Sequence, residues 1–262
     1  MKIISLIQAV VLVLLSAPLF AGDTTVAVAA NFTAPMKRIV EQFEAVSGHQ
    51  VLLAFGSSGK FYAQIINGAP FDLLFSADQI KPSALVTKKL ALADYQTTYA
   101  VGGLALWSAD KQLIDGDASV LRELRFRKLA VANARLAPYG KAAMEVLNAL
   151  QLDNGVISSR LVRGENIAQT YQFVSSGNAE LGFVALAQVM VDGVIEQGSG
   201  WVVPETLYSP IRQDVVLLNR GKDNAAAKAL LDFVKTDKAK ALIHRYGYRT
   251  ENNPLSLPKV SP

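Results

Sequence analysis

A short run of small and polar residues, Gly56 to Gly59, has the composition of an anion-binding turn. It reads Gly-Ser-Ser-Gly and lies between an apolar run, Val51 to Phe55, and a segment with Phe61 and Ile65 at helical spacing. A strand that turns directly into a helix leaves main-chain N–H groups unpaired at the helix start, and the helix dipole adds partial positive charge there. The two serine hydroxyls supply further donors. The run could hold a tetrahedral oxyanion without a lysine or arginine; a serine that only caps the helix is the other interpretation.

The segments around this turn alternate between strand and helix patterns. Three apolar runs predict strands, and the second is expected to be buried; they lie at residues 24–30, 51–55 and 71–76. A β-α-β-α-β order predicts a parallel sheet flanked by helices. In such sheets ligands bind beyond the carboxyl ends of the strands. Asn31, Ser58 and Asp78 each follow a predicted strand, so we expect these three turns to meet at one edge of the sheet.

The N-terminus has the pattern of a cleaved secretory signal peptide. Lys2 precedes an apolar run from Ile3 to Leu15, and small residues follow as far as Ala21 and Gly22. The apolar run is too short for a comfortable membrane span, although an uncleaved anchor remains the alternative. We therefore expect residues 1–21 to be removed and the mature chain to be exported.

The remainder of the chain repeats the alternation and predicts a second lobe. One strand is expected at 99–107, where glycines mark a crossing between lobes, a later strand at 211–218 is placed back near the first sheet, and one long helix is expected at 225–246. Two lobes joined by such crossings close over a ligand in their cleft. We predict an α/β, two-lobed solute-binding fold, with lobe I at 22–99 and 207–262 and lobe II at 100–206.

The composition excludes several classes of function. The chain has no cysteine, so it has no disulfide, no thiol nucleophile and no thiolate metal ligand. It has only two histidines, His49 and His244, far apart in sequence, which excludes a histidine-rich metal site. The formal charge is +4, but the basic residues are scattered, so no nucleic-acid partner is indicated.

Five segments, taken together and in order, resemble one protein family. They are AANFTAPM at 29–36, GSSGKFYAQI at 56–65, GAPFDLLFSAD at 68–78, APYG at 137–140 and VRGENIAQTYQFVSSGNAELGFVALAQV at 162–189. In these segments the mature chain resembles the periplasmic molybdate-binding proteins of molybdate ABC transporters. The resemblance implies a type II-like fold whose lobes are mostly parallel sheets flanked by helices. It also implies a non-enzymatic, monomeric periplasmic carrier without a cofactor, which delivers molybdate to an inner-membrane permease.

The same resemblance implies a set of neutral donors for the oxyanion and no ligands for a metal cation. Asn31 would donate from its side-chain amide and Ser58 from its hydroxyl. Tyr139 and Ile167 would donate main-chain N–H groups from a proline-containing turn and a helix start. Some relatives have a ligand tyrosine at the position of Ala185. One hydroxyl is therefore missing here, and the Asn31 amide or the Tyr139 side chain would replace it.

Several alternatives stay open at this stage. Tungstate nearly matches molybdate in size and charge, and no residue separates the two. A carrier for sulfate would use the same donors, and only the size of the cavity would reject that smaller anion. A secreted serine hydrolase would need Ser57 or Ser58 beside a histidine. An iron(III) carrier would need paired tyrosines with a histidine or carboxylates, and no such cluster is evident. Glu165 would repel a dianion unless it points away, as a capping residue would, and Lys60 would either steer anions or face solvent.

Overall fold

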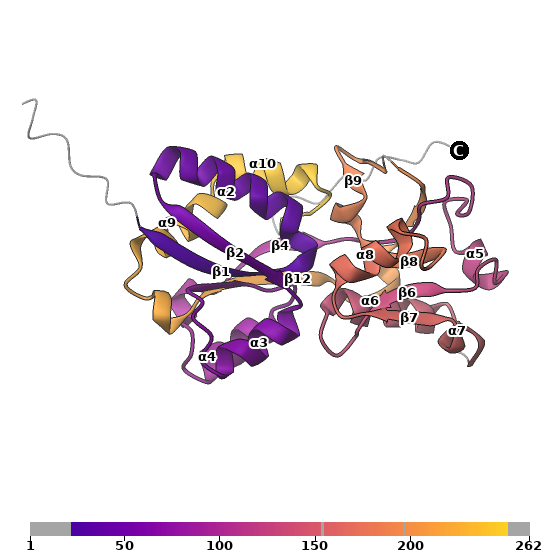
Figure 1. Cartoon of the computed structure of the whole chain (residues 1–262), viewed down its shortest axis with the longest axis horizontal. Coiled ribbons are helices and arrows are strands. Elements are labelled where there is room, and N and C mark those ends of the chain that lie inside the picture. The colour runs from indigo at the N-terminus through magenta and orange to yellow at the C-terminus, as the bar shows by residue number, and fades with distance from the viewer. Residues whose placement is uncertain (1–21, 153–154, 196, 251–262) are drawn as a thin grey trace, which may run out of the picture.

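The computed structural model describes residues 22–152, 155–195 and 197–250. The predicted signal peptide, residues 1–21, lies outside this described part. Two five-stranded sheets form the centres of two lobes that lie side by side (Figure 1). The two lobes confirm the predicted class of fold.

The sheet of lobe I has the strand order β2-β1-β3-β12-β4. Its strands are β1 (Asp23–Ala29), β2 (Gln50–Gly56), β3 (Leu73–Phe75), β4 (Thr97–Gly102) and β12 (Ile211–Leu217). Strand β1 is parallel to β2 and to β3, which confirms the predicted β-α-β units. Strand β12 returns to this sheet as expected, but it runs antiparallel to β3 and β4, so the sheet is mixed.

Strand β2 is an edge strand rather than the buried strand that its apolar run predicts. It pairs with β1 alone, and the side chain of Leu52 is 60% exposed while its neighbour Val51 is buried. Phe55 is also partly exposed, with the Lys37 ammonium 5.8 Å from the centre of its ring. A run of apolar residues does not reveal whether one or both faces of a strand are covered, and here one face is open.

Helices cover both faces of the lobe I sheet (Figure 1). One face carries α2 (Thr33–Ser47), α9 (Ala225–Val234) and α10 (Asp237–Arg245), and the other carries α3 (Ser58–Ile66) and α4 (Ile80–Thr87). The single helix predicted at 225–246 is thus two helices. Thr236 separates them, because its Oγ1 accepts a hydrogen bond from the Ala239 N–H at 3.3 Å and caps a new helix. Apolar residues continue at helical spacing across this break, so the sequence pattern did not reveal it.

The sheet of lobe II has the strand order β11-β5-β8-β6-β7. Its strands are β5 (Leu104–Ser108), β6 (Leu129–Ala132), β7 (Leu161–Gly164), β8 (Leu181–Ala185) and β11 (Ser199–Val202). Strand β6 is parallel to β7 and β8, whereas β5 is antiparallel to β8 and β11. The remaining strands, β9 (Met190–Val191) and β10 (Val194–Ile195), form a small antiparallel pair.

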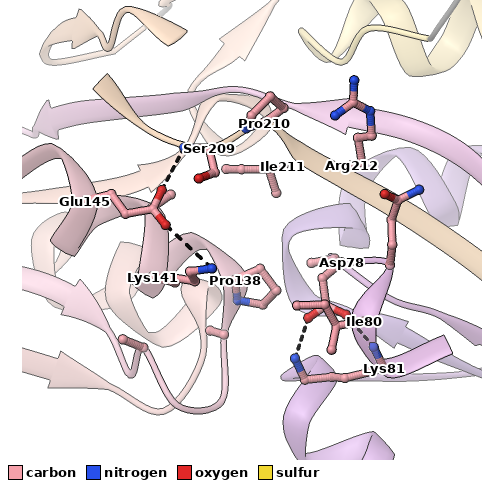
Figure 2. A pocket seen from close by; sticks show the side chains of 15 residues that line it. Asp78, Ile80, Lys81, Pro138, Lys141, Glu145, Ser209, Pro210, Ile211 and Arg212 are labelled. Carbon is pink, nitrogen blue, oxygen red and sulfur yellow. Dashed lines mark hydrogen bonds and ion pairs between the residues drawn. The ribbon is translucent and has the colours of Figure 1, made fainter. Parts of the chain in front are cut away.

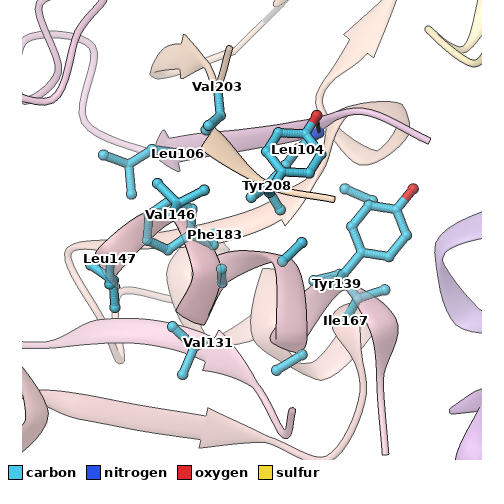
Figure 3. Close-up of a cluster of buried hydrophobic side chains, with 14 of the residues drawn as sticks. Leu104, Leu106, Val131, Tyr139, Val146, Leu147, Ile167, Phe183, Val203 and Tyr208 are labelled. Atoms are coloured by element: carbon cyan, nitrogen blue, oxygen red, sulfur yellow. Dashed lines mark hydrogen bonds between the residues drawn. The ribbon is translucent and has the colours of Figure 1, made fainter. Parts of the chain in front are cut away.

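The helices of lobe II also lie on both faces of its sheet. They are α5 (Ser119–Arg122), α6 (Pro138–Ala149), α7 (Gly155–Ser159) and α8 (Ile167–Ser175). The largest apolar cluster contains residues of α6 and the sheet, and Figure 3 shows Tyr139 and Ile167 at one end of it. Residues of α8 pack with the opposite face, where the rings of Trp107 and Tyr171 stack with centroids 5.1 Å apart. Short 3-10 turns lie at Ala30–Phe32, Ala93–Tyr95, Leu186–Gln188, Glu205–Leu207 and Asn219–Gly221.

The chain crosses between the lobes at a pair of glycines. The single strand predicted at 99–107 is in fact β4 and β5, which belong to different sheets and meet at Gly103. The crossing therefore lies three residues beyond the predicted lobe boundary, and on the return the chain re-enters the lobe I sheet at Ile211. A Cβ on Gly102 would lie 2.1 Å from the Tyr139 Oη, so this crossing passes too close to lobe II for any side chain.

Candidate functional site

A small cavity lies between the two lobes, where the starts of several helices meet. It is lined from lobe I by Ala29, Ala30, Asn31, Gly56, Ser57, Ser58 and Ala77, and from lobe II by Ala137, Pro138, Tyr139, Asn166 and Ile167. The four predicted donor residues are all among them, and all four are buried. The turns after β1, β2 and β3 meet here, as the parallel arrangement of these strands predicts.

Ser58 has a hydroxyl proton that is free to enter the cavity. The capping role belongs to its neighbour, because the Ser57 Oγ accepts from the Lys60 N–H at 3.4 Å. The Ser58 Oγ accepts a hydrogen bond from the Ala77 N–H at 2.9 Å. Its own proton has no acceptor among the described residues, so the hydroxyl can donate to a bound anion.

The side-chain amide of Asn31 faces a buried network instead of acting as a free donor. Its Nδ2 donates to the Gln213 Oε1 at 2.8 Å and to the Tyr248 Oη at 2.9 Å. The Tyr248 hydroxyl in turn donates to the main-chain oxygen of Asn31 at 2.8 Å. An amide nitrogen carries two hydrogens, so both are already used. This arrangement departs from the donation that the family resemblance implies, and it fixes the turn after β1 firmly in place.

Gln213 extends the network across the two lobes. Its Nε2 donates to the Oη of Tyr139 in lobe II at 3.2 Å, and its Oε1 also accepts from the Tyr99 hydroxyl at 3.0 Å. Burial raises the pKa values of Tyr99 and Tyr139 well above the ordinary range, so both hydroxyls remain protonated and neutral. The sequence analysis assigned no role to Gln213, because it lies between Arg212 and Asp214 in the polar part of β12 and nothing local indicates that it is buried.

Two helices of lobe II begin at the cavity, where the first main-chain N–H groups have no partner within the helix. In α8 the Asn166 Oδ1 caps the helix by accepting from the Gln169 N–H at 2.9 Å, which leaves the Ile167 N–H at the first position. In α6 the first residue is Pro138, which has no N–H, so Tyr139 supplies the first donor. The Ile167 side chain packs in the apolar cluster, which leaves its main chain as the polar part available to a ligand.

None of the cavity-lining side chains carries a formal charge at neutral pH. Glu165 lies close by, but its carboxylate pairs with the Lys60 ammonium of lobe I at 2.6 Å. The expected repulsion of an anion is thereby offset, and Glu165 acts as a bridge between lobes while Asn166 does the capping. The described residues also contain no group of three or more histidines and carboxylates that could hold a metal ion.

A wider cleft of about 250 Å³ opens beside the cavity and shares Ala77, Ala137 and Pro138 with it. Figure 2 shows two ion pairs among its charged side chains, Asp78 with Lys81 and Glu145 with Lys141. The Glu145 carboxylate accepts from the Ser209 N–H at 2.7 Å and lies 3.6 Å from the Lys141 ammonium. Arg212 adds a further cation to this lining, so the cleft is polar with an excess of positive charge among its lining residues, which suits a route for an anion toward the cavity.

The positions of the histidines remove the base that a serine hydrolase would need. Neither His49 nor His244 lines the cavity that holds Ser57 and Ser58. His49 precedes β2 at the end remote from Gly56, and its Nδ1 accepts from the Gly22 N–H at 3.0 Å. A serine without a nearby base is a weak nucleophile, so the arrangement of the described residues does not favour a serine hydrolase.

A family model described as bacterial extracellular solute-binding protein matches residues 24–249. The chain belongs to this family. Among the relatives of this solute-binding protein is the molybdate-binding protein ModA of Azotobacter vinelandii, which is 52% identical over 87% of the chain and 90% of that protein. ModA of Rhodobacter capsulatus is 47% identical over 90% of the chain and 92% of that protein.

Solved structures share the same fold. A periplasmic molybdate-binding protein of Azotobacter vinelandii superposes with a TM-score of 0.84 at 38% identity, covering 87% of this chain and 99% of that one. The sulfate-binding protein SubI of Mycobacterium tuberculosis H37Rv superposes with a TM-score of 0.71 at 13% identity, covering 88% of both chains. The second likeness concerns the fold alone. No helix in the described residues is long and apolar enough to cross a membrane.

The buried network gives a prediction for Gln213. Gln213→Leu keeps a similar volume but leaves one hydrogen of the Asn31 amide unpaired and removes one partner from each of the Tyr99 and Tyr139 hydroxyls. Because unpaired buried polar groups are costly, we expect the free energy of unfolding to fall by about 2–4 kcal/mol in urea denaturation. Gln172→Leu, at an exposed position on α8, is the matched control and is expected to change it by less than about 0.5 kcal/mol. Equal stability of the two variants would show that the network contributes nothing.

Proposed function

We propose that this protein binds molybdate, together with tungstate, and delivers it to an ABC permease in the inner membrane. The observation that carries the proposal is an uncharged, buried cavity in which Ser58 has a free hydroxyl proton and helix starts supply N–H groups. The names of the relatives from Azotobacter vinelandii and Rhodobacter capsulatus support the same ligand.

The chemistry of the cavity suits a dianion that has lost its water. A buried anion without counter-charges is stable only when most of its lone pairs accept hydrogen bonds, because nothing else offsets the free-energy cost of removing its water. Hydroxyls and helix-start N–H groups are donors with no charge of their own. Phosphate keeps a proton near neutral pH, and a cage of donors offers that proton no acceptor. The cavity is therefore suited to fully ionised tetrahedral oxyanions.

We assign the donors as follows. Ser58 donates from its hydroxyl, and Tyr139 and Ile167 donate main-chain N–H groups at the starts of α6 and α8. Asn31 contributes through the turn that its side chain anchors, since its amide protons are bound to Gln213 and Tyr248. Ala185 does not line the cavity. Because the Asn31 amide and the Tyr139 hydroxyl both take part in the Gln213 network, we assign Ser58 as the principal side-chain donor.

The setting of this activity is also a proposal. The pattern of residues 1–21 and the extracellular family description support export to the periplasm by a cleaved signal peptide. The cavity is completed by two lobes of one chain, so a monomer is sufficient for binding. The permease would receive the anion when the lobes separate.

Calorimetric titration of the mature protein, stripped of ligand, with molybdate, tungstate, sulfate and phosphate tests the ligand. We expect one-to-one binding of molybdate and tungstate with similar affinity, and weak or absent binding of sulfate and phosphate. If sulfate binds as tightly as molybdate, the alternative of a general or sulfate-specific oxyanion carrier is correct. If none of the four binds, the cavity does not have this function.

Ser58→Ala tests the principal side-chain donor. The substitution removes a hydrogen bond to a charged acceptor, so we expect molybdate affinity to fall by about 1–3 kcal/mol in the same titration. Ser175→Ala, at an exposed position on α8, serves as the control and should bind like the unaltered protein. Unchanged affinity in Ser58→Ala would rule this serine out as a donor.

The affinity is expected to be nearly constant from about pH 6 to pH 9. Tyr139 is the one titratable side chain among the cavity-lining residues. Burial raises its pKa above the ordinary value, so it loses its proton only at a still higher pH and stays neutral throughout this interval. Titrations at several pH values check this, and a loss of affinity with a midpoint inside the interval would reveal a charged group at the site.

A further inference from the structure

Gly59 makes a main-chain contact with the opposite lobe. Its N–H donates to the main-chain oxygen of Leu136 at 2.9 Å, which joins the start of α3 to the loop between β6 and α6. A Cβ at position 59 would lie 2.9 Å from both the Cα and the oxygen of Leu136. Real Cβ atoms do not approach main-chain atoms so closely, so only glycine permits this approach of the lobes.

The conformation of Gly59 does not itself require glycine. Its φ is not positive, unlike that of Gly48 or Gly68, and it lies within the first turn of α3. Alanine is the stronger helix former, so the helix alone would favour alanine at this position. The requirement for glycine therefore comes from the contact with Leu136 and not from the local backbone.

This contact lies beside the cavity. Ser58 precedes Gly59 and Ala137 follows Leu136, and both Ser58 and Ala137 are cavity-lining residues. The next residue of α3, Lys60, adds the ion pair with Glu165 across the same gap. A side chain at such a boundary could move aside by changing its rotamer as the lobes approach. Two main-chain segments in contact cannot move aside in this way.

We propose that the contact between Gly59 and Leu136 is a stop that limits how far the lobes close and so sets the size of the oxyanion they select. This inference rests on the proposed function. At the separation that the stop allows, an anion as large as molybdate reaches donors of both lobes. The smaller sulfate can reach full hydrogen-bond distance on one side only, because the lobes cannot close further around it.

Gly59→Ala tests the stop, with Gly155→Ala as the matched control. A Cβ on Gly155 meets no atom of the described residues within 4 Å, and its φ is not positive, so this substitution adds the same methyl group without such a contact. Thermal unfolding of the ligand-free proteins is measured first. We expect Gly59→Ala to unfold at or above the temperature of the unaltered protein, because it strengthens α3 and the clash arises only on closure.

Titration with molybdate and tungstate, and displacement of molybdate by sulfate, then give the affinities. For Gly59→Ala we expect molybdate and tungstate to bind about tenfold to a hundredfold more weakly, because donors of one lobe move out of reach. Sulfate should lose more than molybdate, so the ratio of their affinities rises. Molybdate affinity within about twofold of the control, or equal losses for molybdate and sulfate, would overturn the proposal.

The failure of this inference can be distinguished from the failure of the proposed function. If the unaltered protein binds none of the oxyanions, the proposed function is wrong. The stop is then judged from crystal structures of the unaltered protein and Gly59→Ala. The distance from the residue 59 nitrogen to the Leu136 oxygen must lengthen through a separation of the lobes. An unchanged distance, or a shift confined to the loop that contains Leu136, would refute the stop.

Discussion

Under the proposed function, the constraint on which the rest of this structure depends is the cost of taking a doubly charged anion out of water without placing an opposite charge beside it. Only a high density of neutral donors meets that constraint, and main-chain N–H groups at helix starts are the densest source available. The fold provides them because each lobe ends its parallel strands at the gap between the lobes and begins a helix there. Ser58, Tyr139 and Ile167 lie at such starts, although they come from three separate helices in two lobes. The nearby charges of Lys60 and Glu165 pair with each other, so together they add no net charge beside the cavity.

The hydrogen-bond network around Gln213 holds two of the cavity-lining residues, Asn31 and Tyr139, in place. Five buried side chains, those of Asn31, Tyr99, Tyr139, Gln213 and Tyr248, are connected by hydrogen bonds, and the connection runs from lobe I into lobe II. Partly satisfied buried networks are costly, whereas fully connected ones specify a single arrangement. The position of the turn after β1 therefore depends on a strand from the far end of the chain.

Much of the site could be predicted from the sequence because its signals are local. A Gly-Ser-Ser-Gly turn between a strand and a helix can be recognised from the local sequence. The β-α-β order then places the turns after β1, β2 and β3 together. The features that were missed depend on contacts between distant segments. Nothing near Leu52 indicates that β2 has a neighbour on one side only, and nothing near Asn31 indicates that Gln213 and Tyr248 take its amide protons. The break at Thr236 was missed because the apolar spacing of two successive helices imitates that of one. Gly59 was considered only as part of the Gly-Ser-Ser-Gly turn, and nothing local indicates that its N–H donates to Leu136 of the other lobe.

The two crossings between the lobes give the chain an unequal order of completion during synthesis. Lobe II is one uninterrupted stretch, from β5 to β11, whereas lobe I begins with β1 and lacks β12, α9 and α10 until the end of the chain has been made. Domains fold as units, and N-terminal segments emerge first. The lobe that carries the N-terminus is consequently the last to acquire its full sheet and core. Its first strands therefore remain without their final partners while the rest of the polypeptide is still being synthesised.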